Sequence, residues 1–122
     1  MSLARSAALF FLACSSAPSP NDVADETEAT WARMDRRVAD YRSSADPYDQ
    51  ELAEMDIAEY ERLRASAAGH RARLLDAMNG ARDESASAHW AAYEADTRRA
   101  ERIVASLERD RDLRQYFSEP ER

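Results

Sequence analysis

Two histidines are the side chains of this 122-residue chain best suited to coordination chemistry. His70 lies ten residues before Gly80, and His89 lies ten residues after Asn79. If the chain reverses at Asn79-Gly80 between two antiparallel helices, both imidazoles lie at the same level, on faces that look towards each other. The spacing therefore predicts that the two histidines meet.

Carboxylates from a third segment would complete such a site. The same register brings the start of the first predicted helix to this level, and with it Asp22, Asp25 and Glu26. Imidazoles with one or two carboxylates suit Zn²⁺, Cu²⁺ or Ni²⁺, and facing histidines in a bundle can also hold a haem. The alternative is structural, since the chain has no Glu-x-x-His, His-x-x-x-His or Cys-x-x-Cys-His motif. In that case no cofactor binds, the two arms approach through small residues, and the imidazoles bond to tyrosine or carboxylate neighbours.

A second candidate site is a group of arginines near the same turn. Arg71, Arg73 and Arg82 could contact lipid phosphates. The turn is expected to point the same way as the start of the first helix, and so towards a membrane anchor. The alternative is that these arginines lie on solvated helix faces.

The elements that would position these residues are helices. The chain is rich in Ala, Glu and Arg and has only two glycines and four prolines. Apolar residues at steps of three and four predict helices over about 22–41, 47–78 and 82–117. Asp46 followed by Pro47 is a start signal for the second helix, because aspartate caps helices and proline suits their first position.

The second helix is expected to bury one continuous stripe of side chains. This stripe comprises Tyr48, Leu52, Met55, Leu63, Ala67, His70, Leu74 and Met78. Asn79-Gly80 should end the helix, because both residues tolerate the left-handed backbone of a helix stop. Trp31 and Trp90 are expected at the edge of the core. The tyrosines expected at the edges of the bundle, with solvated hydroxyls, are Tyr41, Tyr48, Tyr60 and Tyr93.

The predicted fold class is all-α. It is a long antiparallel helical hairpin with a shorter N-terminal helix packed along it, a three-helix bundle over residues 22–118. The first helix should reach back only to the level of about residue 69, so the tip of the hairpin projects as two helices. A homodimer through the hairpin is possible. Tyr116 and Phe117 are expected to cover the turn at residues 43–47.

The first fourteen residues are typical of an export signal. Arg5 precedes a short apolar run over residues 7–13, about half the roughly 20 residues that a membrane span needs. The run ends in Phe11-Leu12-Ala13-Cys14, which resembles the lipobox of bacterial lipoproteins. It departs from the usual pattern, in which leucine stands first and a smaller residue second. Ordinary signal cleavage, or a cytosolic protein, are the alternatives.

The resemblance implies a cellular location and a lipid anchor. Residues 1–13 would be a lipoprotein-type signal peptide, Cys14 would be lipidated as the mature N-terminus, and residues 14–21 would be a tether. The protein would then lie in the cell envelope, anchored to a membrane and facing the periplasm. Ser15 directly after the cysteine resembles the outer-membrane class of enteric-type sorting.

Composition excludes several function classes. All 17 basic residues are arginine, which excludes a lysine Schiff base and a phosphate-loop lysine. Removal of the signal would leave 16 basic and 24 acidic residues, a formal charge of −8 that excludes a general electrostatic footprint for nucleic acid. No sequence motif places a carboxylate beside a nucleophile or a phosphate-binding loop. The leading hypothesis is a non-enzymatic envelope module that binds an unknown envelope protein or acts as a spacer. The alternative is a periplasmic metal-binding or metal-sensing hairpin that uses His70 and His89.

Overall fold

The computed structural model describes residues 20–80 and 83–118. Within these residues the chain is helical and contains no strand, which confirms the all-α prediction. The helices are α2 (Pro20–Ser44), α3 (Pro47–Leu52), α4 (Glu54–Asn79) and α5 (Asp83–Ser118). The predicted signal at 1–13, the lipidation site Cys14 and Arg82 lie outside the described residues.

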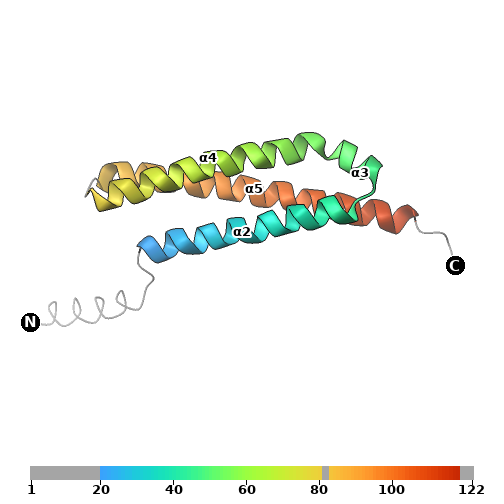
Figure 1. The fold of residues 1–122 in the computed structure, drawn as a ribbon, viewed down its shortest axis with the longest axis horizontal. Coiled ribbons are helices and arrows are strands. Elements are labelled where there is room, and N and C mark those ends of the chain that lie inside the picture. Colours follow the sequence, from blue (N-terminus) through green and yellow to red (C-terminus); the bar gives the residue numbers. More distant parts are fainter. Residues whose placement is uncertain (1–19, 81–82, 119–122) are drawn as a thin grey trace, which may run out of the picture.

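The long helices α4 and α5 form an antiparallel hairpin, and theirs is the most extensive helix pair. Helix α2 lies along both, antiparallel to α4 and parallel to α5 (Figure 1). Figure 1 also shows that α2 begins short of the α4–α5 turn, so the tip consists of two helices, as the sequence predicts. The start of α2 and the C-terminal end of α5 lie at opposite ends of the bundle.

Apolar side chains from three of the helices form the main core. Its buried members are Ala24, Trp31, Met34, Val38, Tyr60, Leu63, Ala67, Leu74, Tyr93, Ala100 and Val104. Trp31 lies in this core instead of at its edge, fully buried, and its indole Nε1–H donates to Thr97 Oγ1 at 2.9 Å. Burial of such large side chains is the dominant force that holds α2 on the hairpin.

The start of α3 follows its sequence signal, whereas α2 starts earlier than predicted. Pro47 opens α3, and Asp46 caps it by accepting the Asp49 N–H on Oδ1 at 2.8 Å. Helix α2 begins at Pro20, so the last two residues of the predicted 14–21 tether are helical. Asp22 therefore lies in the first turn of α2.

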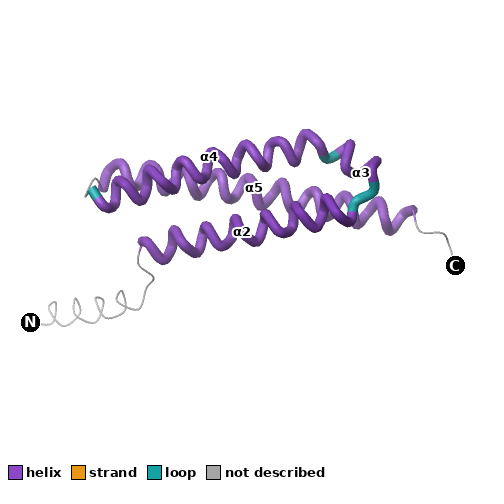
Figure 2. The backbone as a smooth tube through the Cα atoms, viewed as in Figure 1, coloured by secondary structure: helices purple, strands orange, loops and turns teal. Residues whose placement is uncertain are grey.

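The predicted second helix is wrong in one respect, because it breaks at Ala53 into α3 and α4 (Figure 2). On both sides of the break the predicted stripe faces solvent: Leu52 at the end of α3 is exposed, and Met55 in the first turn of α4 is 84% exposed. Ala53 and Ile57 are buried in their place. The residues after the break, from Leu63 onwards, follow the prediction.

Asp49 explains why this stripe faces solvent, because contacts with other helices hold the Asp49 side chain inside the bundle. Its carboxylate pairs with Arg114 of α5, and its carbonyl oxygen accepts the Tyr41 hydroxyl at 3.1 Å. With Asp49 facing the bundle, its neighbour Tyr48 must face outward. A contact from α5 thus overrides the apolar periodicity of α3.

Two further expectations about turns are wrong. Gly80 ends α4 with φ −89°, a right-handed backbone, and its N–H donates to the Asp76 carbonyl at 2.9 Å. Tyr116 and Phe117 are 72% and 78% exposed, so they do not pack over the turn at residues 43–47, although Phe117 and Asp46 line the same groove. That turn is instead held by a second apolar cluster around Tyr41, Ala45 and Leu107.

Candidate functional site

His70 of the predicted histidine site lies beside a carboxylate, which is the kind of neighbour that the structural alternative expects. His70 is half-buried on α4, and its Nε2 lies 3.6 Å from Asp96 Oδ2 on α5. The same carboxylate oxygen accepts the Ser66 hydroxyl at 2.7 Å, and Arg73 Nη2 lies 3.5 Å from His70 Nδ1. A carboxylate of α5 thus faces His70.

The other predicted ligands are not brought together around it. His89 is half-buried, and Asp22 and Glu26 are exposed on α2. Asp25 is engaged elsewhere, since its Oδ1 pairs with Arg71 Nη2 at 2.9 Å. Residues 20–80 and 83–118 contain no group of three or more His, Cys, Asp and Glu side chains positioned to hold a metal ion. The metal hypothesis stays a prediction.

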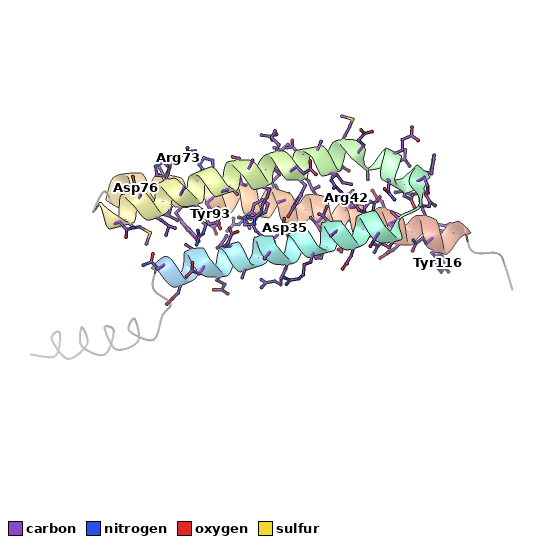
Figure 3. The ribbon with its side chains drawn as sticks, in the orientation of Figure 1. Asp35, Arg42, Arg73, Asp76, Tyr93 and Tyr116 are labelled. Carbon is purple, nitrogen blue, oxygen red and sulfur yellow. The ribbon has the colours of Figure 1, made fainter. Side chains whose placement is uncertain are left out.

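The predicted lipid-contact arginines also have defined surroundings. Arg71 is half-buried against α2 through its ion pair with Asp25, and its Nε atom is buried. Arg73 is exposed on α4 close to the α4–α5 turn (Figure 3). The lipid hypothesis stays a prediction, with one of its three arginines already neutralised by a carboxylate.

A polar network between α2, α4 and α5 went unpredicted. Arg64 Nη2 lies 2.8 Å from Glu28 Oε1 and 3.2 Å from Asp35 Oδ2. Tyr60 donates to Asp35, and Tyr93 donates to Glu28 Oε2 at 3.1 Å. The two tyrosines are buried within the core, so their hydroxyls are bonded to carboxylates and are not solvated as expected.

The network shifts the ionisation of its members. Burial raises the pKa of Tyr60 and of Tyr93 well above the ordinary value, and the nearby carboxylates raise both further. Burial opposes ionisation of Glu28, but the hydrogen bond and charge of Arg64 outweigh it and lower the pKa of this carboxyl. Every polar group has a partner of opposite character, which is the arrangement of a structural network that aligns three helices.

The most unusual surface lies at the other end of the molecule. All the large apolar side chains that are exposed among the described residues belong to α3, to the first turn of α4 or to the last turns of α5, and we call them the apolar end. They are Tyr48, Leu52, Met55, Leu113, Tyr116 and Phe117, between 48% and 84% exposed. Figure 3 shows Tyr116 on the last turns of α5, far from Arg73 and Asp76 at the hairpin tip. A concentration of this kind is typical of an interaction surface.

A groove of about 410 Å³ runs through the apolar end. Tyr48 and Phe117 line it from α3 and α5, together with Leu113. The Asp49–Arg114 ion pair also lines it and joins the two helices. Sequence reasoning missed this surface because it assigned Tyr48 to the core and Phe117 to a turn cover.

Comparison of the chain with protein-family models, with curated proteins and with solved structures gives no match. The functional inference therefore rests on the residues of the chain itself. In the part of the chain that the structure describes, no helix combines the length and the apolar character that a membrane span requires.

Proposed function

We propose that this protein is a lipid-anchored, non-enzymatic module of the bacterial cell envelope that binds another envelope protein through its apolar end. The observation that carries the binding function is the gathering of every exposed large apolar side chain of the described residues at one end of the bundle. Scattered exposed apolar residues are ordinary on any protein, whereas their concentration at one end of a molecule is typical of a contact surface.

The shape of the bundle suits a spacer as well as a binding module. Helix α2 has 25 residues and so extends about 37 Å at 1.5 Å per residue. Its first residue and the apolar end lie at opposite ends of the molecule (Figure 1). A tether that precedes Pro20 and is anchored at Cys14 would therefore present the apolar end away from the membrane. The serine after the cysteine favours the outer membrane.

The anchor can be tested in bacteria that express the full chain in the presence of an alkyne-tagged fatty acid. The wild-type chain should take up the label and sediment with membranes, and Cys14→Ala should lose both properties. Ser16→Ala is the matched control and should behave as wild type. An unlabelled wild-type chain, or equal labelling of Cys14→Ala, would contradict the anchor.

The binding function has its own test in the same cells. A photo-crosslinking amino acid at Tyr116 lies in the apolar end, whereas one at Arg98 lies on an exposed mid-bundle face. We expect one envelope protein to be crosslinked from position 116 and not from position 98. Identical products from both positions, or none from position 116, would contradict binding through the apolar end.

A further inference from the structure

We propose that Met55 is an oxidation site of this protein, where hydrogen peroxide converts the thioether to a sulfoxide and so weakens the contact made by the apolar end. The oxidation site is argued from the geometry of α4 and does not depend on a partner. The effect on contact rests on the proposed binding function, so the two parts have separate tests.

Met55 differs in exposure from the other methionines of the described residues. It is 84% exposed, whereas Met34 is 1% exposed in the main core and Met78, near the end of α4, is half-buried. Methionine is among the residues that proteins most often bury, so a methionine that lies almost wholly in water is unusual. An oxidant dissolved in water therefore reaches the sulfur of Met55 before the other two.

The register of α4 accounts for this exposure. Met55 lies in the first turn of α4, two residues after Ala53 and two before Ile57, and both of these neighbours are buried. Two residues correspond to about 200° around a helix, so Met55 points away from the core when Ile57 points into it. Turning Met55 inward would take Ile57 out of the core, so the thioether stays exposed in the folded protein.

The chemistry needs only a thioether and a peroxide. The sulfur lone pair attacks one oxygen of hydrogen peroxide, and the O–O bond breaks as the S–O bond forms. The departing hydroxide takes the proton from the new sulfoxide oxygen and leaves as water, so the sulfur is oxidised and the peroxide is reduced. Glu54 and Asp56 flank Met55 and are exposed, and their negative charge repels anionic oxidants but not neutral peroxide. Methionine sulfoxide reductases reverse the oxidation.

Oxidation changes the apolar end and leaves the core as it is. Met55 belongs to the apolar end together with Leu52, three residues earlier. A sulfoxide is polar, so a partner that covers it must desolvate an oxygen that an apolar contact does not hydrogen-bond. Met55 is a member of neither apolar cluster of the described residues. The modification therefore weakens the contact without unfolding the bundle.

Peptide mapping of the full chain after brief treatment with hydrogen peroxide tests the site. Trypsin cleaves after arginine, and arginines separate Met34, Met55 and Met78 into three peptides. We expect the Met55 peptide to gain one oxygen atom at least about tenfold faster than the Met34 peptide. Unfolding the chain in urea is the internal control and should bring the three rates together. Equal rates in the folded chain, or faster oxidation of Met34 or Met78, would overturn the site.

The effect on contact is tested by crosslinking from position 116 in cells with and without peroxide. We expect peroxide to lower the yield of the partner crosslink at least about fivefold, and Met55→Gln, a polar side chain of similar length, to lower it without peroxide. Met55→Leu stays apolar and should keep the crosslink in treated cells. Met78→Leu is the matched control and should lose it as the wild type does. An equal loss in Met55→Leu would assign the effect to damage elsewhere and overturn the role of Met55.

The binding function and the oxidation proposal fail in different ways. Absence of a crosslink from position 116 in untreated cells would contradict the binding function, and with it the effect of oxidation on contact, while the peptide map would still decide the site. A crosslink that persists while Met55 is fully oxidised would overturn the effect on contact and leave the binding function intact. Circular dichroism of the oxidised chain should match that of the untreated chain, and a loss of helix would show that oxidation acts on the fold instead.

Discussion

The ion pair between Asp49 and Arg114 gives the sharpest prediction about stability. Asp49 is 2% exposed and is the only buried carboxylate among the described residues. Arg114 donates to it from α5, and this hydrogen bond raises the pKa of the guanidinium. Arg114→Met keeps most of the aliphatic stem but leaves the carboxylate buried without its cation.

The size of the effect follows from the burial of the two partners. Breaking a fully buried ion pair costs about 3–5 kcal/mol. The side chain of Arg114 is 36% exposed, so water can reach part of the vacated space and the cost falls to about 2 kcal/mol. In a domain of about 100 residues that loss lowers Tm by about 8–16 °C.

Thermal unfolding followed by circular dichroism measures this effect, within a cycle of Arg114→Met, Asp49→Asn and both together. The double variant should be more stable than the sum of the single losses implies, because the second change removes the stranded charge. Arg109→Met is the matched control: its side chain is 68% exposed, 4.0 Å from Asp110, and its loss should cost under about 0.5 kcal/mol. Equal losses in Arg114→Met and Arg109→Met would refute the reasoning.

Three other variants test the remaining structure. Gly69→Ala should stabilise the fold by up to about 1 kcal/mol in urea unfolding, because the added Cβ would meet only the Arg73 side chain, at 3.5 Å; destabilisation would reveal a packing role for this glycine. The free energy of unfolding should fall as the pH rises above 10.0, the ordinary pKa of a tyrosine. The raised pKa of Tyr60 keeps this side chain protonated in the folded state, while the unfolded chain ionises. That fall is at most about 1.4 kcal/mol per pH unit, and Tyr60→Phe should show a shallower slope in thermal unfolding between pH 9 and 11; an unchanged slope would contradict the shift. Zinc titration by calorimetry should show no stoichiometric uptake, because His70 faces one carboxylate only; uptake that His70→Ala with His89→Ala abolishes would establish the metal hypothesis instead.

Helix periodicity and capping signals in the sequence predict most of the fold. The three apolar stripes, the start at Asp46-Pro47 and the reversal after Asn79 are local signals, and each is strong because the chain has so few glycines and prolines. The antiparallel order followed from the short connections. The short reach of α2 along the hairpin followed from counting residues along each arm.

The remainder depends on contacts that local patterns do not encode. The break at Ala53 arises from Asp49 meeting Arg114 across 65 positions of sequence. The same contact turns Leu52 and Met55 outward, although their spacing alone predicts burial. The level pairing of the histidines assumed one register, and the structure sets Asp96 against His70. Asp96 lies seven residues after His89, which is about two helical turns along α5.

Intact mass spectrometry of the full chain extracted from bacterial membranes tests the central claim most directly. A lipid-anchored envelope module should lack residues 1–13, begin at Cys14 and carry the added mass of acyl chains, and Phe117→Ser should have the same modification. A mass that matches the unmodified 13.8 kDa chain, or a chain cleaved after Cys14 without added lipid, would contradict it.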